Sequence, residues 1–195
     1  MDKKVKKSEI LKKRIFNEAI ALFTEHGFEN VKVTDICRSL DIATGSFYYY
    51  FPSKEAIFLD YYQSADELLG ELAEELSKQG YSYSEKLKKM MVEKIRAVSG
   101  VGQKMGNVCM SAFLKHLDDS FMDIKRSAYM HFLDIVRTGQ ESGEFRTDLE
   151  PEMIISSLRY VLSGLALHWA CSSDVFDIDL EVEKQAEALI KAIKV

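Results

Sequence analysis

Apolar residues recur along this chain with the spacing of α-helices. A first helix is predicted from about Ser8 to Glu25, and Gly27 follows it as a helix-ending residue would. Its apolar face consists of Ile15, Ala19, Leu22 and Phe23. No run alternates apolar and polar residues between turn signals, as a half-buried strand would. The pattern therefore predicts an all-α protein of about nine helices.

Two short helices joined by a tight turn are predicted between Thr34 and Tyr49. Thr34 is expected to cap the first helix through its hydroxyl, and Asp41 is the turn residue best able to adopt a positive φ. The second helix is predicted from Ala43 to Tyr49 and ends before Pro52, because the residue before a proline is pushed out of the helical region. Helices joined this tightly form a helix-turn-helix, whose second helix enters the major groove of DNA.

A long helix is predicted next, from Lys54 to about Gln79, with Ser53 at its start. Further helices are predicted over residues 84–98, 104–117, 120–141 and 151–170, and a last one begins with Asp179 as its cap. We therefore divide the chain into an N-terminal arm and helix-turn-helix head at residues 1–53, and a larger helical domain at residues 54–195. The long helix links the two.

Three segments follow a known pattern: LFTEHGF, VTDI and GSFYYYFPSK. Together they resemble the DNA-binding segment of the TetR family (TetR/AcrR) of bacterial transcriptional regulators, and the resemblance covers about a quarter of the chain. Two residues depart from the family pattern, Asp41 where Gly is usual and Ala43 where Ser or Thr is frequent. The resemblance implies a helix-turn-helix head, a body that binds a small-molecule effector, and a homodimer formed through the last two long helices.

Charge is distributed unevenly along the chain, whose net charge is −5. Residues 1–54 hold 10 Lys or Arg and 7 Asp or Glu, while residues 55–195 hold 16 and 24. A basic arm leads into the first helix and consists of Lys3, Lys4, Lys6, Lys7, Lys12, Lys13 and Arg14. The positive end of the protein is therefore the end that carries the motif, as binding to DNA phosphates requires.

Candidate DNA-contacting residues lie on the two short helices and just after them. The resemblance assigns this role to Thr34, Thr44, Gly45, Tyr48, Tyr49 and Lys54, and Ser46 adds a short polar side chain on the same helix. Gly45 would let the backbone approach DNA closely, and Lys54 would bind a phosphate. Phe47 and Phe51 are interpreted instead as the apolar anchors of the second helix.

The larger domain holds residues suited to an adaptable apolar pocket. The candidates are Tyr62, Met91, Met105, Cys109, Phe113, His116, Met130 and Trp169. Such residues at helical spacing more often form a core, and the sequence does not identify the ligand. The helix after Pro151 is apolar around most of its circumference, which predicts a dimer interface shared with the last helix. The expected interface residues are Leu158, Leu165, Leu167, Ala186, Ile190 and Ile193.

These features predict a DNA-binding repressor that leaves a palindromic operator when a small molecule binds its larger domain. The alternatives are a regulator without an effector and a helical module that uses the same head for protein contacts. The sequence does not distinguish repression from activation. It holds no GxSxG, phosphate-binding glycine loop, HExxH or EF-hand motif, so we expect neither an enzyme nor a cofactor or metal.

Three cysteines, Cys37, Cys109 and Cys171, stand far apart and outside any CxxC motif, so each is expected to be a buried thiol. No apolar run approaches the ~20 residues of a membrane helix, and no apolar segment follows the basic start as in a signal peptide. A cytoplasmic protein without membrane contact is therefore expected.

Overall fold

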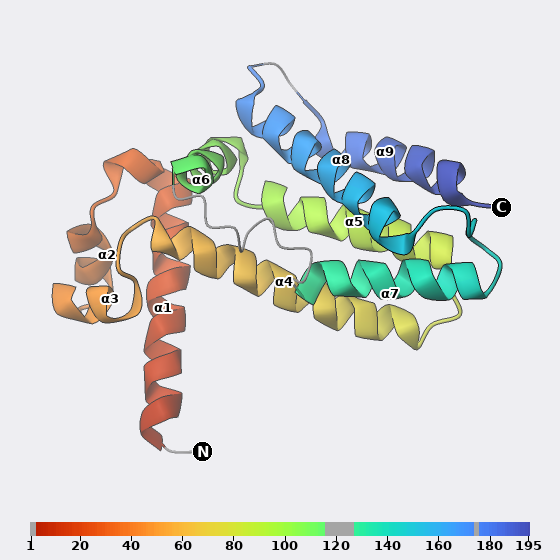
Figure 1. Ribbon diagram of the computed structural model, residues 1–195. Coiled ribbons are helices and arrows are strands. Elements are labelled where there is room, and N and C mark those ends of the chain that lie inside the picture. The colour runs from red at the N-terminus through yellow and green to blue at the C-terminus, as the bar shows by residue number, and fades with distance from the viewer. Residues whose placement is uncertain (1–2, 116–126, 174–175) are drawn as a thin grey trace. The chain divides into compact units, whose positions relative to one another are not determined.

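The computed structural model describes residues 3–115, 127–173 and 176–195 of the chain (Figure 1). In these residues the secondary structure consists of nine α-helices and one short 3₁₀ helix, which confirms the all-α prediction. Extended pairing in the same residues is confined to a single antiparallel bridge between Phe145 and Lys194. The chain forms two compact units, residues 1–63 and residues 64–195.

Unit 1 contains α1 (Lys3–His26), the 3₁₀ helix η1 (Phe28–Asn30), α2 (Val33–Ser39), α3 (Thr44–Tyr50) and the first turns of α4 (Ala56–Ser77). Helix α1 begins five residues before the predicted Ser8, so the basic arm continues the helix. The core of the unit is formed by Ile15, Ala19, Phe23, Phe28, Val31, Ile36, Cys37, Phe47, Phe51, Ile57 and Phe58. Its aromatic rings pack edge-on or tilted against one another, with 5.0 Å between the ring centroids of Phe28 and both Phe23 and Phe58.

The division between the units lies inside α4, ten residues after the predicted boundary between residues 53 and 54. Ile57 and Phe58 explain the difference, because both side chains are fully buried among the aromatic rings of unit 1. The first turns of α4 therefore complete the head, and the later turns belong to unit 2.

Unit 2 contains the rest of α4, α5 (Tyr83–Ser99), α6 (Gln103–Lys115), α7 (Ser127–Glu141), α8 (Pro151–Cys171) and α9 (Ile178–Ile193). Helix α5 packs against α7, α8 and α9, and α6 packs against α8. One apolar cluster runs through the unit and includes Leu69, Leu87, Met90, Phe132, Leu162 and Val182.

Hydrogen bonds fix the helix ends of unit 2. Ser82 caps α5, as its hydroxyl accepts from the Glu85 N–H, and the carboxylate of Glu144 accepts from the N–H groups of Tyr83 and Ser84 at 2.8 and 2.9 Å. Asp177, rather than the predicted Asp179, caps α9 by accepting from the Leu180 N–H at 2.9 Å. The helix therefore begins two residues earlier than a cap at Asp179 would place it.

Helix α8 is, in the described part of the chain, the one helix long and apolar enough to meet a length and composition criterion for crossing a membrane. A core helix meets the same criterion, and Ile155, Leu158 and Leu162 of α8 are buried inside unit 2. We therefore interpret α8 as a core helix of this unit.

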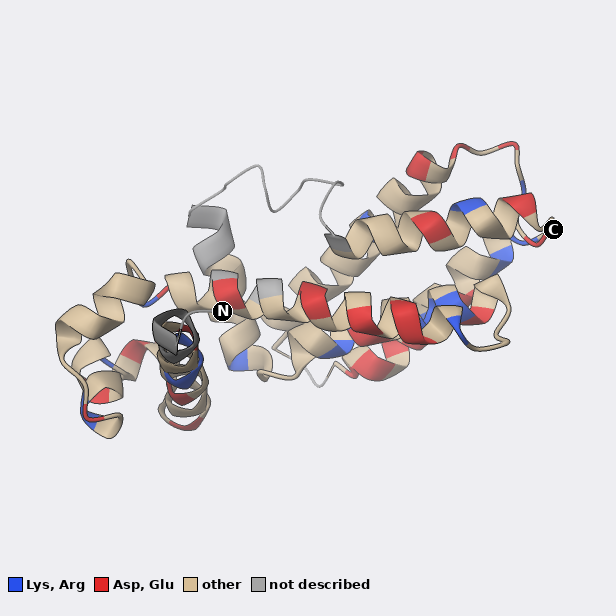
Figure 2. Cartoon of the chain, turned by 90° about the horizontal axis from the view of Figure 1, so that it is seen from below, with Lys and Arg blue, Asp and Glu red and all other residues tan. Residues whose placement is uncertain are grey.

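Acidic residues lie on many helical turns of unit 2, as Figure 2 shows.

Candidate nucleic-acid interface

Helices α2 and α3 are joined by the tight turn that the sequence predicted. Asp41 has a φ of 53°, the positive value expected of it. The turn is closed by backbone bonds from Asp41 N–H to the Arg38 carbonyl at 3.2 Å and from Ile42 N–H to the Cys37 carbonyl at 3.0 Å. The two helices therefore form a helix-turn-helix, with α3 in the place of the recognition helix.

The start of α2 differs from the prediction. The helix begins at Val33, so Thr34 lies inside its first turn and does not cap it. The carboxylate of Asp35 instead accepts from the backbone N–H of Lys32 at 2.9 Å. The side chain of Thr34 is exposed, which leaves its hydroxyl free of the capping role that we had expected.

Two phenylalanines anchor α3 to the rest of unit 1, as predicted. Phe47 and Phe51 are 0% and 1% exposed, and their ring centroids lie 5.7 Å apart. The opposite face of the helix is open: Tyr48 is 52% exposed and Tyr49 is 78% exposed. Burying one face of so short a helix against the core fixes which side chains face outward.

The remaining predicted contacts lie on the same helix. Thr44 and Gly45 are exposed, Ser46 is half-buried, and a side chain at Gly45 would meet no atom within 4 Å. The structure thus brings Thr44, Gly45, Tyr48 and Tyr49 to the outer surface of α3. Their contact with DNA stays a prediction.

A thiol in α2 is linked to the first residue of α3. Burial raises the pKa of the Cys37 thiol, and a hydrogen bond with the Thr44 side chain opposes that rise with a smaller effect. This bond joins the two helices next to the turn, where Ala43 at the cap position has no hydroxyl to offer. Cys37 is therefore a structural thiol, as is the buried Cys109, whose pKa burial raises to about 12. Cys171 is exposed, which corrects the expectation of three buried thiols.

The basic arm is partly used inside unit 1. The Lys12 ammonium lies 2.7 Å from the Asp60 carboxylate and 5.6 Å from the centroid of the Phe51 ring. Ser8 and Tyr50 share a hydrogen bond of 3.0 Å between their hydroxyls. Lys12 therefore braces the head, whereas the neighbouring Lys13 and Arg14 are exposed on α1.

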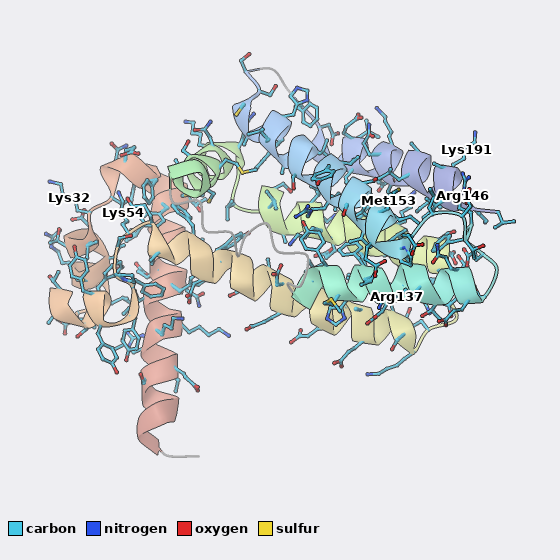
Figure 3. All side chains as sticks on the ribbon, viewed as in Figure 1. Lys32, Lys54, Arg137, Arg146, Met153 and Lys191 are labelled. Atoms are coloured by element: carbon cyan, nitrogen blue, oxygen red, sulfur yellow. The ribbon has the colours of Figure 1, made fainter. Side chains whose placement is uncertain are left out.

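Lys54 has partners that the sequence did not indicate. Its ammonium donates to the carbonyls of Phe28 and Val31 at 2.6 and 2.9 Å, and it lies 3.9 Å from the centroid of the Phe28 ring. Lys32 and Arg38, by contrast, have exposed side chains beside and on α2 (Figure 3 labels Lys32 and Lys54). Their positions in the sequence, directly before and within the first helix of the motif, are a signal by which they could have been predicted to bind phosphates.

The predicted effector residues separate into three groups. Met91, Met105, Cys109 and Trp169 are buried in unit 2, and Trp169 packs so closely on Gly106 that a Cβ there would lie 2.4 Å from its ring. Met130 is 40% exposed on α7, so it lies outside the core, and its contact with a ligand stays a prediction. Tyr62 and Phe113 lie in α4 and α6, but their side chains are outside the described residues, as is the whole of His116.

Unit 2 also buries charged side chains that sequence reasoning missed. The Lys94 ammonium donates to the Asp66 carboxylate at 2.9 Å, and both side chains are about nine-tenths buried. Arg159 of α8 is 8% exposed. A signal was available for Asp66, because it falls among the apolar residues Ala65 and Leu69 on the inward stripe of α4.

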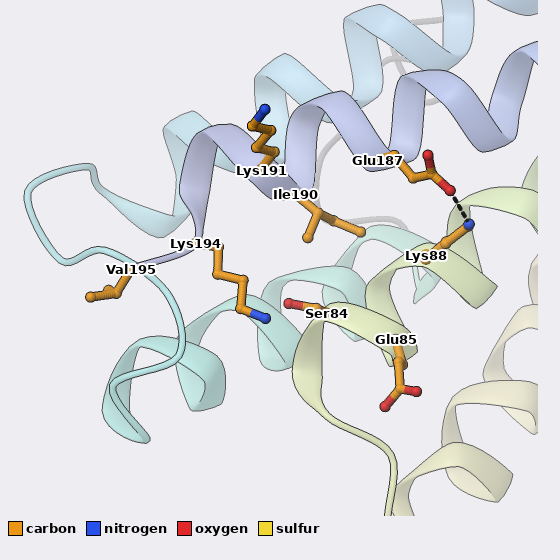
Figure 4. A pocket seen from close by; sticks show the side chains of 8 residues that line it. All are labelled: Ser84, Glu85, Lys88, Glu187, Ile190, Lys191, Lys194 and Val195. Atoms are coloured by element: carbon orange, nitrogen blue, oxygen red, sulfur yellow. Dashed lines mark hydrogen bonds and ion pairs between the residues drawn. The ribbon is translucent and has the colours of Figure 1, made fainter.

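A surface hollow of about 450 Å³ lies between the start of α5 and the end of α9 (Figure 4). Its lining residues are Ser84, Glu85, Lys88, Glu187, Ile190, Lys191, Lys194 and Val195. The Lys88 ammonium is paired with the Glu187 carboxylate at 2.6 Å. None of the residues predicted to bind an effector lines this hollow. Separately, no group of three His, Cys, Asp or Glu side chains that could hold a metal ion occurs in the described residues.

The residues predicted for the dimer interface differ in exposure, and their contact with a second copy stays a prediction. Leu158, Leu165, Ala186 and Ile193 are buried in the core of their own unit, so they offer little surface to a second copy. Leu167 is 45% exposed, and Ile190 is half-buried at the hollow. His168 of α8 is exposed, and an exposed stripe of the same helix consists of Met153, Ser157, Tyr160, Gly164, Leu167 and Cys171. These residues are three, four or seven apart, which places them on one face of the helix.

Comparison with known proteins assigns the head to a family. Residues 15–61 match the family model described as bacterial regulatory proteins, tetR family. The regulator IcaR of Staphylococcus aureus (strain Newman), a negative transcriptional regulator of the biofilm operon icaADBC, is 40% identical over 48 residues. The matched segment is 25% of this chain and 26% of IcaR, so it spans about a quarter of that relative.

Solved structures extend the likeness of fold to nearly the whole chain. The transcriptional regulator FadR from Bacillus subtilis, solved with stearoyl-CoA, has a TM-score of 0.66 at 19% identity, covering 92% of this chain and 98% of FadR. The TetR family regulator PfmR from Thermus thermophilus has a TM-score of 0.65 at 20% identity, covering 91% of this chain and 97% of PfmR. Both have the arrangement of a helix-turn-helix head followed by a larger helical domain.

Proposed function

We propose that this chain, which belongs to the tetR family of bacterial regulatory proteins, is a DNA-binding transcriptional repressor released from its operator by a small molecule. The observation that carries the proposal is the outward face of α3. Tyr48, Tyr49 and Thr44 are exposed there beside the open backbone of Gly45, while Phe47 and Phe51 fix the helix from behind. Such a face can enter a major groove without disturbing the core.

The side chains of this face suit DNA. Hydroxyls of Tyr48 and Tyr49 can donate to phosphate oxygens, and their rings can lie against thymine methyl groups. Thr34 adds a hydroxyl at the start of α2, and the exposed Lys13, Arg14, Lys32 and Arg38 supply positive charge to the same unit. The similarity of the head to IcaR, a negative regulator, favours repression over activation.

The small-molecule part of the proposal rests on unit 2. The neighbour FadR was solved with stearoyl-CoA, and unit 2 of this chain combines buried methionines and Trp169 with the charged pair of Asp66 and Lys94. An apolar interior with a few polar groups is the usual composition of a ligand site. From the likeness to bacterial transcriptional regulators we further propose that the chain has no catalytic role and acts in the cytoplasm.

The dimer is assigned to the exposed stripe of α8. A palindromic operator requires two heads related by a two-fold axis, and a largely apolar stripe that is exposed among the described residues can supply the self-complementary surface. Gly164 in the middle of the stripe lets two helices approach closely, since no atom of its own chain lies within 4 Å of a Cβ at this position.

The test is binding of the full chain to fluorescein-labelled duplex DNA taken from the region upstream of its own gene. We expect tight binding to one short palindrome, with an affinity that falls steeply as salt rises because phosphate contacts release counterions. Equal affinity for that duplex and for scrambled DNA of the same composition would reject a sequence-specific regulator and favour the protein-interaction alternative.

A further inference from the structure

We propose that Lys54 is a positioning residue that fastens the segment before α2 to the start of α4, and that the phosphate contact expected of it is made by Lys32. The inference rests on the proposed DNA-binding function.

The ammonium of Lys54 is already surrounded by partners of its own unit. An ammonium has three N–H donors, and two of them are used by the carbonyls of Phe28 and Val31 at 2.6 and 2.9 Å. The ring of Phe28 covers the cation at 3.9 Å, and that of Phe23 lies 5.9 Å away. Hydrogen bonds to a charged donor and a cation over an aromatic face are each stronger than their neutral counterparts.

The two carbonyls belong to the first residue of η1 and to the residue that follows its last, just before α2. Phe28 opens η1, and Val31 follows the end of η1 two residues before α2 begins. A positive charge at the end of a helical turn stabilises its carbonyls. Lys54 lies two residues before α4, whose N-terminal N–H of Ala56 is held by the Ser53 hydroxyl at 3.3 Å. One side chain therefore ties the entry of the helix-turn-helix to the entry of α4.

With two N–H groups donated to carbonyls and the Phe28 ring over the cation, the half-buried Lys54 can offer a phosphate only its one remaining N–H group. The side chain of Lys32 is exposed directly before α2, so its ammonium is open to a phosphate. It lies two residues before Thr34, which also has an exposed side chain. Salt dependence separates the two roles, since each phosphate contact contributes about 0.9 to the slope of log K against log salt.

The experiment compares Lys54→Gln, Lys32→Gln and the unchanged chain, using the duplex from the region upstream of the gene. For Lys54→Gln we expect about tenfold weaker binding at every salt concentration, an unchanged slope, and a lower melting temperature without DNA. For Lys32→Gln we expect an unchanged melting temperature and a slope flatter by about 0.9 for each head. A flatter slope in Lys54→Gln, with or without a change in melting temperature, would overturn the proposal.

A second measurement uses the unchanged chain and does not depend on the folding of a variant. The ¹H–¹⁵N signal of the Lys54 ammonium, assigned by its absence from Lys54→Arg, should be protected from exchange in the free protein and should keep its shift when the duplex is added. A shift of this signal on DNA binding, with the Lys32 signal unmoved, would reverse the assignment. Failure of the unchanged chain to bind the duplex specifically would reject the proposed function instead and would leave the exchange protection of Lys54 as the measure of its structural bonds.

Discussion

Gly45 is the residue of the recognition helix at which folding and DNA binding can be separated. Its position is helical and open, with no atom within 4 Å of an added Cβ. Gly45→Ala should therefore preserve the fold and can stabilise it by up to about 1 kcal/mol through helix propensity. The same methyl group would stand between α3 and DNA, so we expect operator affinity to fall at least about tenfold.

Thermal unfolding and fluorescence anisotropy on one preparation of Gly45→Ala would measure both effects. Gly80→Ala is the control for stability, because its Cβ also meets open space and it lies outside unit 1 and outside the proposed dimer interface. Unchanged operator affinity in Gly45→Ala would show that the backbone of α3 does not approach DNA at this residue.

Individual side chains differ in how far the sequence predicts their surroundings. The pattern of α3 predicted its buried and outward residues correctly, because a seven-residue helix with Phe47 and Phe51 has only one apolar face. Lys54 gave no such signal: its partners are backbone carbonyls, and their positions depend on how the chain folds around Phe28. A pattern of residue types does not encode those positions.

At the scale of elements, the start of α5 depends on a carboxylate from another part of the chain. Burial raises the pKa of Glu144, but hydrogen bonds from Ser84 and Tyr83 and the charge of Lys194 outweigh it, so the pKa lies below its ordinary value of 4.5. A carboxylate with a lowered pKa in the folded state stabilises the protein above its unfolded pKa, and this contribution disappears as the pH falls through the folded value.

Glu144→Gln should consequently lower the stability of unit 2 at pH 7 by about 1 kcal/mol, the usual contribution of a helix cap. The difference from the unchanged chain should shrink as the pH is lowered from about 5 to 3. Urea unfolding at several pH values would measure it, with the exposed Glu141→Gln as the control. A difference that stays constant with pH would contradict ionisation of Glu144 as its cause.

Helix positions were largely predictable because their apolar spacing is regular, whereas helix starts and inward faces were less so. Thr34 and Asp179 were both predicted as caps, yet Asp35 and Asp177 form the observed bonds. Helix α8 presents a similar limit: with apolar residues on all sides, its sequence does not show which face turns toward the core. Packing against its neighbouring helices selects Leu158 and Leu165 for the interior and leaves Tyr160 outside.

For the whole molecule, the exposed stripe of α8 predicts the oligomeric state. Tyr160 is 61% exposed, so Tyr160→Asp should leave the single chain folded but should place a charge in the middle of a dimer interface. An unpaired buried charge costs several kcal/mol, and we expect the variant to be monomeric at micromolar concentration by light scattering. Leu68→Asp on α4, at a residue of similar exposure, should remain a dimer. Dimers in both variants would place the interface elsewhere.

The proposed effector response also belongs to this scale. Helix α4 contains 22 residues and is therefore about 33 Å long, and it passes through the boundary between the two units. A ligand in unit 2 that tilts α4 would change the distance between the two heads of a dimer, which the operator fixes. By linkage, saturating operator DNA should weaken ligand binding by the same factor as ligand weakens DNA binding. Calorimetric titration of a binding metabolite, with and without the operator duplex, would measure this factor, and equal affinities would favour the regulator without an effector.

The sharing of α4 also has a consequence for heat resistance. The helix buries Ile57 and Phe58 in the core of unit 1, and Leu69 and Leu76 in the core of unit 2. Helix formation is cooperative along a continuous segment, so the loss of either core removes support from turns that the other core needs. The two units should therefore melt together in a single calorimetric transition. A head severed within α4 would lose this mutual support and should denature at a lower temperature than the same residues in the intact chain.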